Sequence, residues 1–183
     1  MTIESLEGGT EDHYLRLRIP NLDVRQSLER GYIAEIFGRD FELDNFILEA
    51  KRTANHIASD PTGEAVKKLM ISAYSRLPHD WVCKDEKEAK RYFLAFMVFA
   101  RAEVVGEEQH SLGRPDAVLK TEKGIYIFEF KYDESAEAAL DQCHNKHYAD
   151  AFAADDNVHY VGVNYDPETR TINDLKIEEV VSG

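Results

Sequence analysis

Several features that would assign this chain of 183 residues to a particular class of protein are missing or scarce. No apolar run approaches the roughly 20 residues that a membrane-spanning helix needs. The polar start, MTIESLEGGTED, lacks the apolar centre of a signal peptide. The two cysteines, Cys83 and Cys143, could form one bridge, but without a secretion signal we expect both to be reduced and to serve in packing. These absences predict a cytoplasmic protein with no membrane segment.

Basic residues are also scarce, because 22 Lys and Arg stand against 35 Asp and Glu, which gives a formal net charge of -13. The imbalance is concentrated late in the chain. Residues 1–103 contain 15 basic and 18 acidic residues, a net -3, whereas residues 104–183 contain 7 and 17, a net -10. Binding to nucleic acid usually depends on Lys and Arg that neutralise phosphates. The charge therefore argues against strong autonomous binding to DNA, unless a basic surface comes from a partner or another domain.

The hydrophobic content of 43% is sufficient for one substantial core, and the pattern of elements changes near residue 80. Before that point we expect a strand at 14–19 and helices at 23–37, 41–57 and 64–77. A helix at 85–102 is apolar almost all round at its centre, so we expect it to be buried against a sheet. The other expected elements are strands at 104–108, 115–120 and 125–132, an alanine-rich helix at 134–153, and strands at 158–164 and 171–180. The sequence therefore predicts a strand and helical subdomain over residues 1–80 and an α/β core over residues 81–183.

The most informative segment is GRPDAVLKTEKGIYIFEFK at residues 113–131, because it sets Asp116, Glu129 and Lys131 into apolar, strand-like runs. The period of two along a strand puts Glu129 and Lys131 on the same face. If residues 121–124 form the turn, paired positions sum to 245 and Asp116 lies opposite Glu129, with Cβ atoms roughly 5 Å apart. A loop of residues 122–124 would instead put Asp116 opposite Phe130, on the other face.

Facing carboxylates at Asp116 and Glu129 would repel each other, and burial would raise the pKa of at least one of them unless a cation lay between them. A divalent metal ion bound by oxygen ligands satisfies such a pair. Lys131 is expected directly beside it. The hairpin therefore predicts a metal site.

The order Asp116, then Glu129-Phe130-Lys131, resembles the D…(D/E)xK signature of the PD-(D/E)XK nuclease superfamily, here with Pro115 before the aspartate. The flanking segments GRPDAVL, IYIFEFK, ALDQ with Tyr148, and VGVNYDPETRTINDLKI are similar to one branch of it. That branch is a poorly characterised nuclease-like domain found C-terminal to an AAA-ATPase-like domain in bacterial and archaeal proteins. The N-terminal LRIPNLDVRQSL is similar to the segment that leads into it. The resemblance implies a restriction-endonuclease-like core, a mixed central sheet flanked by helices.

The resemblance also implies a metal-dependent nuclease, in which Mg²⁺ or Mn²⁺ is held by Asp116, Glu129 and the carbonyl of Phe130. Lys131 would assist the attack of water on the phosphate. Glu107 stands where the family's strand carries an acid, either as an additional metal ligand or as half of an exposed acidic pair. The implied partners are nucleic acid, with DNA favoured over RNA, and an ATPase-like domain.

Residues on the following helix are the next candidates. Gln142 occupies a position from which several branches of the superfamily contact the site, so we expect it to be functional. Tyr148 is expected to be a core aromatic. Arg114 could contact a phosphate or pair with the surrounding acids.

The long helix departs from the family's pattern, because Lys90 and Leu94 stand where the resemblance implies an acid and a histidine. A shifted alignment offers Asp85, Glu86 or Glu88 as the acid. With the net charge of -10 over residues 104–183, this departure leaves a second function open, a non-catalytic module of nuclease fold that binds a partner protein or its own ATPase-like half. A third alternative is an activity that requires an N-terminal ATPase-like domain.

Overall fold

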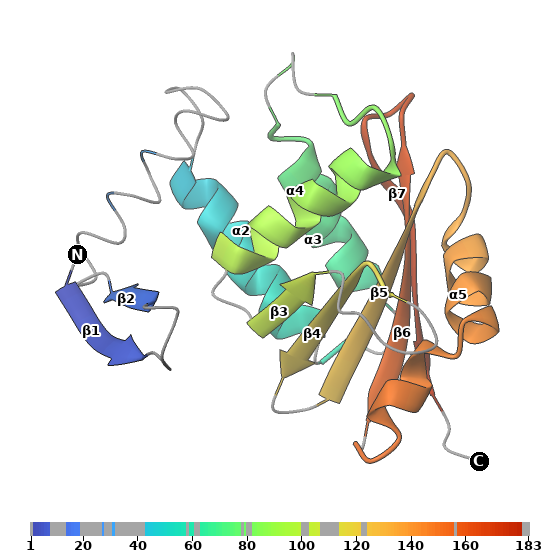
Figure 1. Cartoon of the computed structure of the whole chain (residues 1–183). Coiled ribbons are helices and arrows are strands. Elements are labelled where there is room, and N and C mark those ends of the chain that lie inside the picture. Colours follow the sequence, from blue (N-terminus) through green and yellow to red (C-terminus); the bar gives the residue numbers. More distant parts are fainter. Residues whose placement is uncertain are drawn as a thin grey trace. The chain divides into compact units, whose positions relative to one another are not determined.

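The computed structural model of the chain divides into two compact units, Met1–Leu43 and Asp44–Gly183 (Figure 1). The residues that it describes are 2–7, 14–18, 27, 31, 43–57, 59–60, 63–77, 79, 82–99, 103–106, 114–121, 124–155 and 157–180. In these residues no helix is long and apolar enough to cross a membrane. The expected boundary at residue 80 stays a prediction.

The first unit contains a two-stranded antiparallel ribbon. Strand β1 (Thr2–Glu7) pairs with β2 (Tyr14–Arg18), with a shift of register between Ile3 and Ser5. Strand β2 confirms the strand expected at 14–19, whereas β1 was not foreseen in the polar N-terminus. The helix expected at 23–37 lies outside the described residues except for Ser27 and Gly31, which are helical.

The second unit is built on a mixed sheet in which the described strands follow the order β3-β4-β5-β6-β7. Neighbouring strands are antiparallel except for β5 and β6, which are parallel. The strands are β3 (Glu103–Gly106), β4 (Ala117–Thr121), β5 (Gly124–Tyr132), β6 (Val158–Asp166) and β7 (Thr171–Glu179). The parallel pair needs a crossover, and α5 (Ala136–Asn145) with the short helix η1 (Tyr148–Phe152) provides it.

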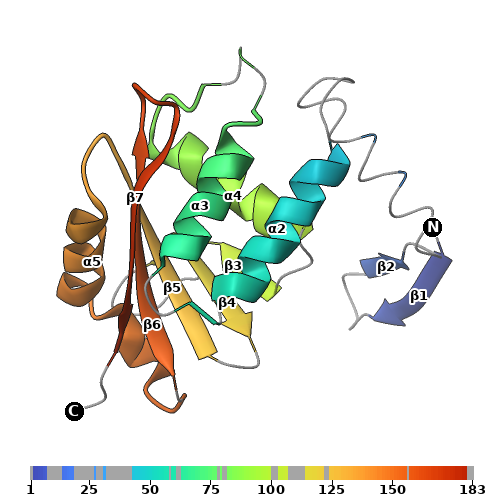
Figure 2. The ribbon, with the colours of Figure 1, turned by 180° about the vertical axis from the view of Figure 1, so that it is seen from behind.

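Helices cover both faces of the sheet. Helix α5 lies on one side, and α2 (Leu43–Ile57), α3 (Glu64–Tyr74) and α4 (Glu86–Phe99) lie on the other (Figures 1 and 2). The order of elements from α4 to β7 is the expected one. The mixed sheet flanked by helices confirms the predicted fold class, a restriction-endonuclease-like core.

Aromatic side chains hold α4 in place, as the apolar centre of this helix predicts. Phe93 packs on Phe128 and Phe130 of β5, with ring centroids 4.7 and 5.2 Å apart. The Tyr74 hydroxyl donates to the Ala89 carbonyl (3.1 Å), and the Tyr92 hydroxyl donates to the Ala73 carbonyl (3.2 Å). These reciprocal hydrogen bonds satisfy the buried hydroxyls and fix α3 against α4. The start of α4 therefore has a defined place above the sheet.

The core on the other face lies between α5, η1 and the sheet. Ser135 caps α5 by accepting the Ala138 N–H (3.1 Å). The buried cluster consists of Val118, Ile125, Ile127, Leu140, Cys143, Tyr148, Phe152, Val158 and Tyr160. Cys83 and Cys143 are both buried and free, which agrees with the packing role expected for them.

The helix expected at 134–153 is wrong in one respect, because it is broken after Asn145. His147 has a φ of 51°, in the left-handed region, and η1 follows it. In a continuous helix Tyr148 would be rotated by about 140° from the buried Cys143, away from the sheet. The break instead lets Tyr148 and Phe152 enter the core. The apolar stripe of α5 would otherwise have continued at Lys146 and His147, and this polar pair is the signal in the sequence that the prediction missed.

Gly162 of β6 lies where α5 approaches the sheet most closely, and replacing it by alanine tests this packing. A Cβ atom there would meet the Ala136 carbonyl oxygen at 2.2 Å and the Leu140 Cγ at 3.0 Å. We expect Gly162→Ala to lower the free energy of unfolding by about 1–3 kcal/mol, measured by urea unfolding. The matched control is Gly31→Ala, whose added Cβ meets nothing within 4 Å. Equal effects of the two substitutions would contradict this packing.

Candidate metal centre

The hairpin of β4 and β5 has the register expected for a turn at residues 121–124, in which the numbers of two paired residues add up to 245. Ala117 pairs with Phe128 and Lys120 with Ile125. Thr121 closes the hairpin, since its hydroxyl accepts the Gly124 N–H (3.1 Å). The first of the two loops considered from the sequence is therefore confirmed, and the shorter loop is wrong.

Asp116 lies immediately before β4 and is almost buried, with 7% of its surface exposed. Its backbone N–H donates to the Phe128 carbonyl (3.2 Å), which continues the pairing with β5. One carboxylate oxygen, Oδ2, accepts the backbone N–H of Phe130 (2.9 Å). The other, Oδ1, accepts a hydrogen bond from Lys90 Nζ of α4 (2.8 Å). The carboxylate is therefore fixed between the strand and the helix.

Glu129 lies in the sheet and is more deeply buried, at 2% exposed. Oε1 of its carboxyl group accepts a hydrogen bond from the side-chain amide of Gln142 on α5. The other oxygen, Oε2, is buried and has no hydrogen-bond partner among the described residues. Burial, and then repulsion from Asp116, raise the pKa of Glu129 to about 8, although Lys131 acts in the opposite direction. A buried oxygen without a hydrogen-bond partner is uncommon, and a proton, a water molecule or a cation would satisfy it.

Lys131, two residues further along β5, places its ammonium group among acceptors. Lys131 Nζ lies 3.1 Å from the carbonyl oxygen of Phe130, 3.5 Å from Oε2 of Glu86 and 3.8 Å from Oε1 of Glu129. The residue is 9% exposed. A positive charge is thereby held beside two carboxylates, as the spacing along the strand predicts.

Glu86, the first residue of α4, is the helix acid that reaches this cluster. The other two candidates cap the helix, since Asp85 Oδ1 accepts the Glu88 N–H (2.8 Å) and Glu88 Oε2 accepts the Lys84 N–H (2.9 Å). Both carboxylates are thereby turned to the helix end, which leaves Glu86 to face the strands. The sequence alone left this choice among three acids open.

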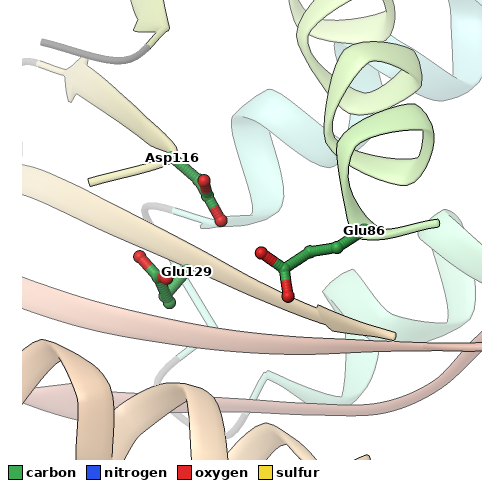
Figure 3. Close-up of side chains that lie close together, drawn as sticks. All are labelled: Glu86, Asp116 and Glu129. Carbon is green, nitrogen blue, oxygen red and sulfur yellow. The ribbon is translucent and has the colours of Figure 1, made fainter. Parts of the chain in front are cut away.

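One carboxylate oxygen from each of Glu86, Asp116 and Glu129 lies within 4.8 Å of the others (Figure 3). The three side chains meet between the start of α4 and the strands β4 and β5. Carboxylate oxygens are the ligands that hard divalent cations prefer. A cation among them would lie beside the Glu129 carboxyl group, one oxygen of which has no hydrogen-bond partner among the described residues. The cluster therefore has the chemistry of a site for a divalent metal ion.

Lys90 was foreseen only as a departure from the family's pattern, and its contact with Asp116 was missed. The signal was available, because Glu86 and Lys90 are four residues apart and so share one face of a helix. The side chains of Lys90 and Asp116 are 13% and 10% exposed, so this ion pair is largely shielded from water.

The other predicted residues have varied surroundings. The Phe130 carbonyl accepts a hydrogen bond from Lys131. Tyr148 is a buried core residue, and its hydroxyl donates to the carbonyl of the exposed Arg114 (3.3 Å). Glu107 lies outside the described residues.

The comparison with protein families gives one finding. The model of the PD-(D/E)XK nuclease superfamily matches residues 84–175, which are 92 of the 183 residues. The matched segment contains Glu86, Asp116, Glu129 and Gln142 and ends within β7. No curated protein and no solved structure gave a significant match.

Glu86 and Glu88 can be separated by their effect on metal binding. We expect Glu86→Gln to weaken Mn²⁺ binding about tenfold or more, because it removes one anionic ligand, whereas Glu88→Gln leaves the affinity unchanged. Isothermal titration calorimetry without nucleic acid measures both. Loss of affinity in the Glu88 variant alone would show that the wrong helix acid has been assigned.

The raised pKa of Glu129 predicts how the stability of the metal-free protein depends on pH. Folding raises this pKa from 4.5 to about 8, so between these values the folded protein holds a proton that the unfolded chain has lost. The contribution of Glu129 to stability is therefore fully present below pH 4.5 and is lost as the pH rises from 4.5 to about 8, a loss of a few kcal/mol at most.

The check is urea unfolding in EDTA at several pH values, compared with Glu129→Gln, which has no proton to lose. As the pH rises, the free energy of unfolding of the wild type should fall relative to that of the variant. The exposed substitution Glu134→Gln is the control. A difference that stays constant from pH 5 to 8 would contradict the raised pKa.

Proposed function

The chain belongs to the PD-(D/E)XK nuclease superfamily, and on that premise we propose that it is a metal-dependent nuclease that hydrolyses phosphodiester bonds. One observation carries the proposal. The buried Oε2 of Glu129 has no hydrogen-bond partner among the described residues, and the carboxyl group that carries it belongs to a cluster with the carboxylates of Asp116 and Glu86. A divalent cation held by the three carboxylates accounts for both facts.

We assign the ligand set to Asp116, Glu129 and Glu86, with the carbonyl oxygen of Phe130 as a further donor. The ion is Mg²⁺ or Mn²⁺, because both accept an all-oxygen ligand set. The Phe130 carbonyl already accepts a hydrogen bond from Lys131, and a carbonyl oxygen has a second lone pair for a ligand. Glu107, which lies outside the described residues, stays a candidate for an additional ligand.

When bound, the divalent cation lowers the pKa of a water molecule and offsets the charge that develops on the phosphate. The other tasks belong to side chains of this protein. Lys131, with its ammonium group beside Glu86 and Glu129, orients the attacking water and stabilises the negative charge of the transition state. Gln142 holds the Glu129 carboxylate by a hydrogen bond to one oxygen, which leaves the other oxygen for the cation.

The net charge of -13 would repel an anionic substrate. Basic residues on the exposed side of α4 can offset this repulsion locally. Lys84 precedes this helix, Lys87 and Arg91 lie in its first two turns, and all three are exposed at near-helical spacing. In the sequence, Lys84 and Lys87 lie on either side of Glu86. We assign to the three basic residues the contacts with the phosphate backbone next to the site, as Lys and Arg commonly make.

Finer features of the function rest on the resemblance of segments such as GRPDAVL and VGVNYDPETRTINDLKI to one branch of the superfamily. On this basis we propose that the protein acts together with an AAA-ATPase-like domain. We also propose that it acts in the cytoplasm, on DNA rather than RNA. Residues 81–183 would form the nuclease core and residues 1–80 a strand and helical subdomain.

A second candidate function is a non-catalytic module of nuclease fold that binds a protein partner. The observation that favours it is that Lys90 and Lys131 already neutralise part of the acidic cluster. In such a module the ammonium groups would replace the metal ion. Mn²⁺ binding that depends on Asp116 argues for the nuclease, and the absence of such binding argues for the module.

The nuclease proposal is tested with labelled DNA and RNA in the presence of Mn²⁺. We expect Asp116→Asn and Lys131→Met to lower the cleavage rate by at least about a hundredfold, because they remove a metal ligand and the group that assists the attack. The exposed Asp141, next to Gln142 on α5, supplies the matched control Asp141→Asn, which should cleave like the wild type.

Circular dichroism of each variant verifies that it is folded. Cleavage at the same rate by the wild type and the Asp116 variant would trace the activity to a contaminant and refute the proposal. So would the failure of the wild type to cut any of the substrates under conditions in which it binds Mn²⁺.

A further inference from the structure

Two lysines share the acidic cluster with its three carboxylates, and only one of them belongs to the signature of the superfamily. Lys131 is the lysine of that signature. Lys90 comes from α4, and its ammonium group lies 2.8 Å from Oδ1 of Asp116. The opposite oxygen of this carboxylate is held by the N–H of Phe130. Lys90 therefore contacts the oxygen of Asp116 to which the Phe130 N–H does not donate.

This contact places a positive charge beside a carboxylate that a metal ion in the cluster would share. Divalent cations of the Mg²⁺ and Ca²⁺ type lie about 2.0–2.6 Å from their oxygen ligands. An ion on Oδ1 of Asp116 and an ammonium group 2.8 Å from the same oxygen would be only a few ångströms apart. Like charges at such a separation repel strongly where water is largely excluded, and both side chains are nearly buried.

The backbone of Lys90 has little freedom to move away. The preceding residue, Ala89, accepts the hydrogen bond of the Tyr74 hydroxyl, and Tyr92 donates to the carbonyl of Ala73. Phe93 is packed against β5. The lysine side chain, by contrast, is a flexible four-carbon stem. A change in the position of the ammonium group is therefore a change of side-chain rotamer and does not require movement of the helix.

We propose that Lys90 is a built-in counter-cation that competes with the divalent metal ion for Asp116, so that the ammonium group must leave the carboxylate before the metal binds. Lys90 is thus a positioning residue that holds Asp116 in place without metal and lowers the affinity of the site. The inference rests on the proposed metal site but not on catalysis. Lys90, which stands where the resemblance implies an acid, would thereby regulate the affinity of the site for the metal ion.

The test is isothermal titration of the full chain with MnCl₂ in the absence of nucleic acid. Lys90→Met keeps the length of the side chain and removes its charge, so Mn²⁺ should bind about tenfold tighter or more than to the wild type. Lys90→Arg keeps the charge and should bind Mn²⁺ like the wild type. Lys68→Met, on the exposed side of α3, makes the same change of net charge away from the cluster and should have no effect.

The increase in Mn²⁺ affinity must also depend on Asp116. The tighter binding should therefore disappear in the double variant Lys90→Met with Asp116→Asn. Thermal unfolding in EDTA verifies the fold of each variant, and Lys90→Gln replaces the Met variant if that one unfolds. If the uncharged variant binds Mn²⁺ as weakly as the wild type or more weakly, the proposed competition is refuted. If only the uncharged variant binds Mn²⁺, the competition is supported while the nuclease proposal for the wild type fails.

Discussion

Burial of the Glu129 carboxyl group in the sheet is the constraint on which the candidate metal centre depends. At 2% exposure and beside Asp116, an ionised carboxylate is unfavourable unless a positive charge compensates it. The protein offers a partial solution through the amide of Gln142 and the ammonium group of Lys131. One oxygen still lacks a partner among the described residues. The group therefore either keeps its proton, as the pKa of about 8 indicates, or shares a cation with its neighbours.

Helix α4 supplies charges of both signs to this cluster, and the aromatic core determines where they lie. Glu86 and Lys90 point to the strands from successive turns of the helix, while Asp85 and Glu88 are used for capping its start. Phe93 and the tyrosine pair across α3 and α4 hold the helix at a set place over β5. The geometry of the site is consequently a product of core packing, since a shift of the helix would separate its acid from the strand carboxylates.

Most of the architecture was predictable from the sequence because its signals are local. Alternation along 125–132 identified β5 and its two faces, and the closing residues Thr121 and Gly124 are consistent with the register that pairs Lys120 with Ile125. The break after Asn145 was missed because alanine-rich helical propensity suggested a continuous helix. Core packing overrode that propensity, since only the broken helix turns Tyr148 and Phe152 to the sheet. The choice among three acids at the start of α4 was likewise beyond the sequence, because capping and metal binding use the same residue types.

By itself, the sequence determined the family, through the D…(D/E)xK signature and its flanking segments, and the mixed α/β order of elements, through the periodicity of strands and helices. It also put Asp116 opposite Glu129 in one of the two registers that it left open. Tertiary structure alone decided that Glu86 is the acid that joins them and that Lys90 lies on Asp116. These contacts link residues 26 or more positions apart. Their distances follow from how α4 packs on β5, which depends on the whole aromatic core and on no single motif.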